Sequence, residues 1–393
     1  MPDNEALLHH GSHRDLLQPP AAQELAADLE PDGPGVDAVI VPTARPPAYL
    51  ADVAQLAEAL GCPLVTLHST KWTTAAETRR RLDILHADVD LIAIDIPEAG
   101  RLHLPDWATS RLLAGTVFAR RTDVSAKRNL ALMLGAMAGW SRILFLDDDI
   151  IKLDPGDMRA AARLLDTHNA VGLKNDGYPD NSVVCHAYRL AGGQQQVFVG
   201  AGALAIDLAR SRSFFPDIYN DDWFFLLDAD RHLQPTTTTG HVYQHPYDPF
   251  RSPHRARAEE LGDVLAEGLY WLLDQGRSIM DADERHWSMF LARRARFVRG
   301  VLAMTEKSTA ESQAEKDRRI AALKGSLGRL ALIRPAFCEQ YLQAWTADRA
   351  AWQRHLDALP GGQPIPAAID VLSRPEFPPL TWERVARRPG AGR

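Results

Sequence analysis

Three consecutive aspartates, Asp147, Asp148 and Asp149, directly follow the apolar run ILFL. Two carboxylates about 4 Å apart repel each other by roughly 4 kcal/mol at an effective dielectric constant near 20, so positive charge must lie among them. If the extended backbone continues to residue 149, Asp147 and Asp149 project to one side and Asp148 to the other. The outer pair could then bind Mg²⁺ or Mn²⁺, which completes its coordination with water and substrate phosphates. The alternative is an acidic helix cap, for which one aspartate suffices.

A second acidic pair, Asp221 and Asp222, lies among aromatic residues in the segment FFPDIYNDDWFF. Partial desolvation in such surroundings raises the pKa of a carboxyl group, which suits a general base. Some twenty residues later, GHVYQHPYDPF contains His241 and His245. A neutral imidazole is a reasonable third protein ligand for manganese, and we favour His245 over His241. The alternatives are an acidic first turn of a helix and a structural loop histidine.

Basic and hydroxyl side chains precede these acids. Thr43 and Arg45 follow a predicted strand, where they could contact a nucleotide or serve only a structural loop. Lys127 and Arg128 open an apolar helical run, so that their charges and the helix N-terminal amides could face a diphosphate, or they could form a solvated first turn. The N-terminal histidines could bind a metal adventitiously, although a solvated, poorly ordered tail is the favoured interpretation: His9, His10 and His13.

The elements that must position these residues follow a β-α-β-α-β alternation that starts with VDAVIVP at residues 36–42. Such alternation predicts an α/β fold with a mainly parallel sheet and helices on both faces. Helical spacing of apolar residues then predicts a helical C-terminal lobe. The expected divisions are a flexible tail at 1–35, a domain at 36–250 with parts 36–150 and 151–250, the helical lobe at 251–360, and an extended or disordered tail at 361–393.

Composition limits the class of protein. A net charge of −7 argues against a general nucleic-acid binder, and no apolar run is long enough to cross a bilayer. The three cysteines are far apart and form no CxxC pair, which indicates a reducing cytoplasm. The N-terminus lacks the basic and apolar regions of a secretory signal. A soluble cytoplasmic protein is therefore expected.

Five segments together resemble a known family. LDDDI resembles the DXD motif of nucleotide-sugar glycosyltransferases of the GT-A fold, and the resemblance extends in order over residues 36–250. The other matching segments resemble family 2 enzymes of that fold: VIVPTARP, SAKRNLAL, VGAGALAID and NDDWFF. Within the family, the triple aspartate, the later Asp-Asp pair and the following histidine are most similar to bacterial galactofuranosyltransferases.

The resemblance implies a GT-A-type, Rossmann-like sheet that binds a nucleoside diphosphate sugar, with UDP as the expected nucleotide. It implies Mn²⁺ or Mg²⁺ held by Asp147, Asp149 and His245. Many family 2 enzymes carry an acidic residue after the second strand, whereas VTLHST offers His68 and Ser69, so Asp95 is the candidate substitute. The expected nucleotide-sugar-binding residues are Thr43, Arg45, Asp95, Lys127, Arg128, Asn129 and Asp148.

For the reaction, the family pattern implies inverting transfer by direct displacement, with Asp222 as the base and Asp221 orienting the acceptor. Gly200, Gly202 and Trp223 are expected on the acceptor side, where Trp223 could stack on a sugar although such rings are more often core. The alternatives are a retaining transferase and a non-catalytic binding module. A sugar-nucleotide pyrophosphorylase is disfavoured because VPTARPPAYL lacks a Gly-rich loop.

The acceptor is expected to be a glycan, a lipid-linked molecule or a small molecule rather than a nucleic acid. The basic segment RRARFVR at residues 293–299 could contact an anionic membrane surface, although a solvated helix face is the favoured interpretation. The sequence fixes neither the sugar, nor the acceptor hydroxyl, nor the oligomeric state.

Overall fold

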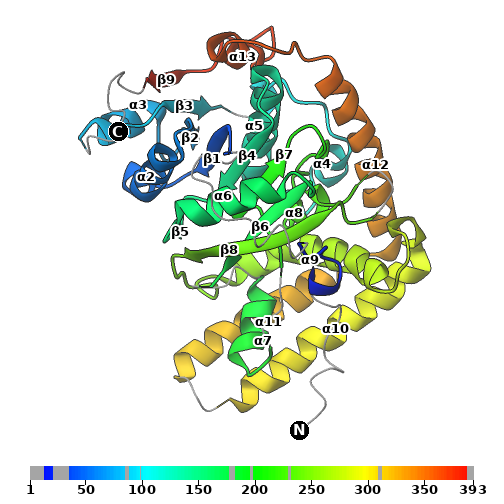
Figure 1. Ribbon diagram of the computed structural model, residues 1–393. Helices are drawn as coiled ribbons and strands as arrows, with labels where there is room; N and C mark the ends of the chain where they lie inside the picture. Colours follow the sequence, from blue (N-terminus) through cyan, green and yellow to red (C-terminus); the bar gives the residue numbers. More distant parts are fainter. Residues whose placement is uncertain are drawn as a thin grey trace.

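The computed structural model describes residues 13–20, 35–84, 88–97, 99–176, 182–194, 198–228, 232–308 and 312–386. Within this part of the chain, a nine-stranded sheet has the order β5-β8-β6-β7-β4-β1-β2-β3-β9 (Figure 1). Its strands are β1 (Ala38–Thr43), β2 (Leu64–Ser69), β3 (Leu91–Ile96), β4 (Arg142–Leu146), β5 (Ile150–Ile151), β6 (Ala170–Asn175), β7 (Ala203–Asp207), β8 (Thr236–Gln244) and β9 (Trp382–Val385).

The sheet is mixed. Strand β1 lies parallel between β2 and β4, and β2 is parallel to β3. Strand β7 is antiparallel to both β4 and β6, and β8 is parallel to β6. The two edges carry antiparallel strands, β5 beside β8 and β9 beside β3. The predicted α/β class is therefore confirmed, and the parallel part is interrupted by β7.

Helices cover both faces, as the alternating strand pattern requires. In β1, Ala38 and Ile40 pack with α5, whereas Val39 and Val41 pack with α2 and α6 on the opposite face. The helices before the C-terminal lobe are α2 (Ala51–Leu60), α3 (Ala75–Ile84), α4 (Ala108–Leu113), α5 (Val124–Ala138), α6 (Pro155–Leu164), α7 (Val183–Leu190) and α8 (Asp221–Phe225).

The C-terminal helices continue the core of the sheet. They are α9 (Pro253–Asp274), α10 (Glu284–Lys307), α11 (Gln313–Leu330), α12 (Pro335–Asp357) and α13 (Ile365–Val371). Apolar side chains of α9 and α12 share one buried cluster with β1, β4 and α5. In Figure 1, α9, α10 and α11 lie together, and α12 runs from them along the molecule toward α13.

Two expected tails are partly folded, so these predictions were wrong there. Residues 361–393 contain α13, which buries Ala368 and Ile369, and β9, which pairs with the edge of β3 from Ile94↔Trp382 to Leu91↔Val385. Pairing satisfies a sheet edge that would otherwise be open, which explains the order. In the N-terminal tail, His13–Asp15 form a short 3₁₀ helix with His13 buried. His9 and His10 lie outside the described residues.

Candidate active site between two pockets

The triple aspartate lies at the point where the strand order changes direction. From β1 the sheet continues to β2 and β3 on one side and to β4 on the other. In α/β sheets, ligands bind outside the carboxyl ends of the strands at such a point. Thr43 ends β1 there, and Asp147 directly follows β4. The Ile150 N–H donates to the Asp147 carbonyl (3.2 Å), so a turn replaces the extended strand that we predicted for the aspartates.

Arg45 and Thr43 neutralise two of the aspartates. Arg45 Nη2 donates to Asp149 Oδ2 (2.9 Å), and Arg45 Nε lies 3.4 Å from Asp148 Oδ1. Thr43 Oγ1 donates to Asp148 Oδ2 (2.8 Å), which also accepts the Ala44 N–H (3.1 Å). Burial alone would lower the pKa of Arg45, but Asp149 and Asp148 outweigh that effect and raise it. Thr43 and Arg45 therefore shape the aspartate turn directly.

Arg128 joins the two acidic motifs of the sequence. Its Nη2 donates to Asp147 Oδ1 (3.0 Å), and its Nη1 donates to Asp221 Oδ1 (2.9 Å). The Arg128 side chain is 6% exposed. Burial opposes its charge, yet Asp221 and Asp147 together raise the pKa of Arg128 above its ordinary value. The positive charge that the aspartates require is thus supplied in large part by two arginines of the chain itself.

The predicted three-ligand metal site is not assembled. In the described part of the chain, no three His, Cys, Asp or Glu side chains are arranged to hold a metal ion. Asp149 is 8% exposed and its Oδ2 accepts from both Arg45 and Gln244, while the exposed His245 ring lies edge-on to Tyr49. His241 pairs with Asp176 instead. The outer aspartates have different partners, since Asp147 bonds Arg128 whereas Asp149 bonds Arg45 and Gln244.

Asp147 alone among the three retains substantial exposure, at 28% of its side chain. The site therefore fits a cation with one carboxylate ligand whose remaining coordination comes from water and substrate phosphates, as is common for Mg²⁺. It does not fit a cation held by three protein ligands.

A large pocket opens on the β1, β2 and β3 side of the turn. It has a volume of about 2010 Å³, including the part open to solvent, and its lining includes Ala44, Ser69, Trp72 and Asp123. Lys127 lies behind it and donates to Thr43 O (2.9 Å) and Ser69 Oγ (2.5 Å), with Asp123 Oδ1 at 3.1 Å. Burial lowers the pKa of Lys127, and Asp123 opposes that shift. Lys127 thus fixes the Thr43 backbone and the Ser69 side chain beside the pocket.

Two predicted nucleotide-binding residues make hydrogen bonds within the fold, and one of them, Asn129, also lines the larger pocket. Asp95 Oδ1 accepts the Ala75 N–H at the start of α3 (2.7 Å), and burial raises the pKa of Asp95. Asn129 exchanges two hydrogen bonds with the Phe215 backbone, one at 2.8 Å and one at 2.9 Å. Neither the Asp95 carboxylate nor the Asn129 amide is oriented toward the aspartate turn by these contacts. At the end of β2, His68 is buried, and burial lowers its pKa to about 3.

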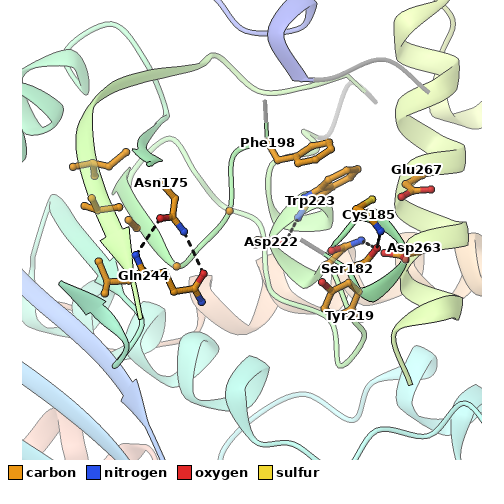
Figure 2. Close-up of a pocket in the computed structure, with 17 residues that line it drawn as sticks. Asn175, Ser182, Cys185, Phe198, Tyr219, Asp222, Trp223, Gln244, Asp263 and Glu267 are labelled. Atoms are coloured by element: carbon orange, nitrogen blue, oxygen red, sulfur yellow. Dashed lines mark hydrogen bonds between the residues drawn. The ribbon is translucent and has the colours of Figure 1, made fainter. Parts of the chain in front are cut away.

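A smaller pocket adjoins the turn through Ile150, which follows the aspartates, and through Gln244 (Figure 2). Its volume is about 780 Å³, including the part open to solvent, and its lining includes Gly200, Gly202, Asp222, Trp223 and Gln244. Asp222 Oδ2 accepts the Ala201 N–H (2.9 Å), and Asp222 Oδ1 accepts the Trp223 N–H (2.9 Å). These two bonds fix the carboxylate at the pocket wall.

The glycines predicted on the acceptor side keep this wall open. A Cβ atom at Gly200 would lie 3.1 Å from Asp222 Oδ2, and one at Gly202 would lie 3.3 Å from Asp147 Oδ2. Asp221, by contrast, does not line the described wall of this pocket. Its Oδ1 accepts from Arg128 and its Oδ2 accepts from Ser125 Oγ (2.8 Å), so both carboxylate oxygens are engaged within the fold. Trp223 is largely core, at 6% exposure, with one part of the ring at the pocket.

Sequence reasoning missed several residues of the site. Gln244 Nε2 donates to Asp149 Oδ2 (3.2 Å), and the amides of Gln244 and Asn175 bond each other across β8 and β6, as Figure 2 shows. Trp72, 65% exposed, stands at the rim of the larger pocket. Gln244 directly precedes His245, so proximity to a predicted ligand was its only signal. Asn175 ends a strand next to a single aspartate, Asp176, and no motif marked it as part of a site.

One arginine of the basic segment at residues 293–299 lies inside the protein, whereas Arg293, Arg296 and Arg299 are partly or fully exposed. Arg294 is fully buried and bonds Glu260 (3.0 Å), Asp263 (2.6 Å) and Glu267 (2.6 Å) of α9. Arg294, Phe297 and Val298 thus form the inward side of α10 at helical spacing, and Arg294 takes no part in the exposed basic surface. No helix of the described residues combines the length and apolar character needed to cross a bilayer.

No family model matches the chain, and no curated protein sequence matches it. Among solved structures, the chain is similar to the mannosyltransferase PcManGT from Pyrobaculum calidifontis in complex with GDP-Man and Mn²⁺. The two share 15% sequence identity over 84% of this chain and 91% of that chain, with a TM-score of 0.41. A likeness at this level assigns neither a donor nor a metal to this chain.

Proposed function

We propose that the protein is a glycosyltransferase of the GT-A type, which moves a sugar from a nucleoside diphosphate sugar to an acceptor hydroxyl. One observation carries the proposal: the Asp147–Asp149 turn at the strand-order switch bonds residues of both pockets. Asp148 accepts from Ala44, which lines the larger pocket, and Asp149 accepts from Gln244, which lines the smaller pocket together with the fixed carboxylate Asp222. A transfer reaction needs two substrate sites that meet at one point, and two pockets that adjoin one acidic turn support such a reaction.

The donor nucleotide belongs in the larger pocket. That pocket lies outside the carboxyl ends of β1, β2 and β3, where nucleotides bind in α/β sheets. Trp72 offers an exposed ring on which a base can stack, and Thr43, Arg45 and Lys127 lie at the end that adjoins the aspartate turn. The favoured nucleotide is UDP, a proposal that rests on the motif resemblance.

The acceptor belongs in the smaller pocket, with Asp222 as the general base. As the acceptor oxygen attacks the anomeric carbon, its proton passes to the Asp222 carboxylate, and the bond from the anomeric carbon to the diphosphate oxygen breaks. Attack from the side opposite the diphosphate inverts the anomeric configuration. Arg128 couples the two halves, since it holds Asp147 at the turn and Asp221 beside the base.

A divalent cation, if bound, would take Asp147 as its protein ligand and would neutralise charge on the departing diphosphate. Asp147 is favoured because its side chain is 28% exposed, whereas that of Asp149 is 8% exposed. Calorimetry of nucleoside diphosphate binding, with Mn²⁺, with Mg²⁺ and with chelator, tests this assignment in the wild type and in Asp147→Asn.

The activity itself is tested by a screen of purified protein against sugar nucleotides, with nucleoside diphosphate release as the readout. We expect Asp222→Asn to retain nucleotide binding and to lose transfer by about 10²- to 10⁴-fold, the range typical of a lost general base. The matched control is Asp166→Asn, which removes a surface carboxylate paired with Arg142.

Substantial turnover in Asp222→Asn would remove Asp222 from the base role. The anomeric configuration of the product, read by NMR, then distinguishes displacement with inversion from a retaining reaction in which Asp222 only positions the acceptor. Absence of diphosphate release with every sugar nucleotide, despite nucleotide binding, would favour a binding module instead of an enzyme.

A further inference from the structure

The N-terminal segment 13–20 packs against the wall of the smaller pocket. His13 is 1% exposed, although it begins a segment that composition marks as a solvated tail. The N–H groups of Leu16 and Leu17 donate to the His13 carbonyl (3.0 Å each), and the Gln18 N–H donates to Thr236 O at the start of β8 (2.9 Å). The side chains of Leu16 and Leu17 pack on the main core. The buried His13, the backbone hydrogen bond to β8 and the packing of Leu16 and Leu17 therefore hold the segment in place.

The His13 ring completes an aromatic cluster behind the pocket. Its centroid lies 4.2 Å from that of Trp223, 4.5 Å from that of Tyr270 and 5.5 Å from that of Phe198. Phe198 and Trp223 line the pocket, side by side in Figure 2, with their centroids 5.2 Å apart. His13 is not among the residues that line the pocket, so any effect on a bound acceptor passes through these two rings.

His13 also anchors the backbone that carries the pocket glycines. The Val199 N–H donates to His13 Nδ1 (3.0 Å), which requires that this nitrogen carry no proton. Two residues later, the Ala201 N–H donates to Asp222, and the Gly202 carbonyl accepts from the Asp147 N–H. The segment 198–202 is thus held at three successive points by His13, the proposed base and the aspartate turn.

We infer that His13 is a positioning residue of the acceptor site, a role that rests on the proposed function of the smaller pocket. Through His13, the N-terminal segment then contributes to the acceptor site. By fixing Val199 and buttressing Trp223, His13 sets the wall against which an acceptor sugar lies. His13 is not among the described residues that line the larger pocket, so we expect donor binding to be independent of it.

Two substitutions separate the hydrogen bond from the ring packing. His13→Phe keeps an aromatic ring of similar size and removes the acceptor nitrogen, whereas His13→Ala removes both. The matched control is Asp15→Ala, because Asp15 belongs to the same 3₁₀ helix and is exposed. The acceptor probes are methyl glycosides of common hexoses, and water serves as the acceptor in donor hydrolysis.

For His13→Phe we expect the acceptor KM to rise about tenfold, the equivalent of one lost hydrogen bond to a structured wall, with the donor KM unchanged. Hydrogen exchange should accelerate at the Val199 amide and stay slow at Ala201. His13→Ala should raise the acceptor KM further, and Asp15→Ala should match the wild type. A merely structural role predicts lower stability with both KM values unchanged or both altered in parallel, and either result overturns the inference.

A second measurement distinguishes failure of the proposed transfer activity from failure of the positioning role of His13. If no glycoside is transferred, binding of the same methyl glycosides is measured by ligand-observed NMR. Weaker binding to His13→Phe than to the wild type, with accelerated exchange at Val199, supports the positioning role even without transfer. Absent binding, equal binding, or unchanged exchange at Val199 overturns it.

Discussion

Replacement of Arg128 by methionine tests the electrostatic basis of the site. Arg128 bonds the buried Asp221 (2.9 Å) and the partly exposed Asp147 (3.0 Å), so Arg128→Met leaves Asp221 as a buried carboxylate without its cation. Loss of one partner from a buried ion pair typically costs about 3–5 kcal/mol. The pair with Asp147 adds about 1 kcal/mol or less, because solvent screens a carboxylate that is 28% exposed. We therefore expect a loss of about 4 kcal/mol in the free energy of unfolding.

A double-mutant cycle isolates this effect. Arg128→Met combined with Asp221→Asn removes both buried charges, so the double variant should be more stable than the sum of the single losses predicts, by about 1–3 kcal/mol. Urea denaturation followed by circular dichroism measures each variant. The matched control is Arg79→Met, which breaks an exposed ion pair of similar length with Glu383 (2.8 Å) and should cost about 1 kcal/mol or less.

Two results would refute the reasoning. Equal losses for Arg128→Met and Arg79→Met would mean that the aspartates do not depend on the buried guanidinium. Strict additivity in the cycle would mean that Arg128 and Asp221 do not interact energetically in the folded protein.

Other expectations follow from packing, titration and the donor pocket. A Cβ atom on Gly262 of α9 would lie 2.1 Å from Tyr219 O, so Gly262→Ala should destabilise the folded protein by about 1–3 kcal/mol. A Cβ atom on Gly328 of α11 meets no atom within 4 Å, so Gly328→Ala should stabilise the folded protein slightly. Thermal denaturation of the two variants and the wild type measures both effects. Burial raises the pKa of Glu260 from 4.5 to about 7 despite Arg294. Between these two values the folded state holds a proton that the unfolded state loses, so the free energy of unfolding should fall as pH rises from about 4.5 to 7. Glu260→Gln should flatten this dependence of stability on pH. A steeper dependence in the variant would contradict the raised pKa of Glu260. Trp72→Ala should weaken nucleotide binding about tenfold in calorimetry if the base stacks there, and should leave it unchanged if the base lies elsewhere.

The sequence predicted the strand ends of the site well. The apolar runs before Thr43 and before Asp147 are long and bounded by polar residues, so they located both β1 and the start of the aspartate turn. Asp222 was separated from Asp221 by the family pattern, and the structure gives the two carboxylates different surroundings. The strand ends could be predicted because their signals lie within a few residues of one another, whereas the role of Asp222 stays a prediction.

Tertiary contacts account for what the sequence did not disclose. The alternation argument for Asp147 and Asp149 assumed that the strand continued, and the turn closed by Ile150 removed its premise. Arg45 and Arg128 neutralise the aspartates from other parts of the chain, so local sequence patterns did not reveal these contacts. His13 has a polar, charge-rich neighbourhood in sequence, and only the rings of Phe198, Trp223 and Tyr270 make its burial favourable.

The folded C-terminal segment also depends on a tertiary contact that local sequence signals do not reveal. Strand β9 is four residues long and contains Glu383 and Arg384, so it has little strand signal of its own. It is ordered because the edge of β3 supplies partners for its backbone groups.

The most direct test of the two-pocket arrangement is a crystal structure of the protein with the nucleoside diphosphate that binds most tightly, grown with Mn²⁺ and a methyl glycoside. We predict the nucleoside in the larger pocket beside Trp72, the diphosphate at the Asp147–Asp149 turn, and the glycoside in the smaller pocket with a hydroxyl at Asp222. A nucleotide seated in the smaller pocket, or one whose phosphates point away from the aspartate turn, would contradict the assignment of both substrate sites.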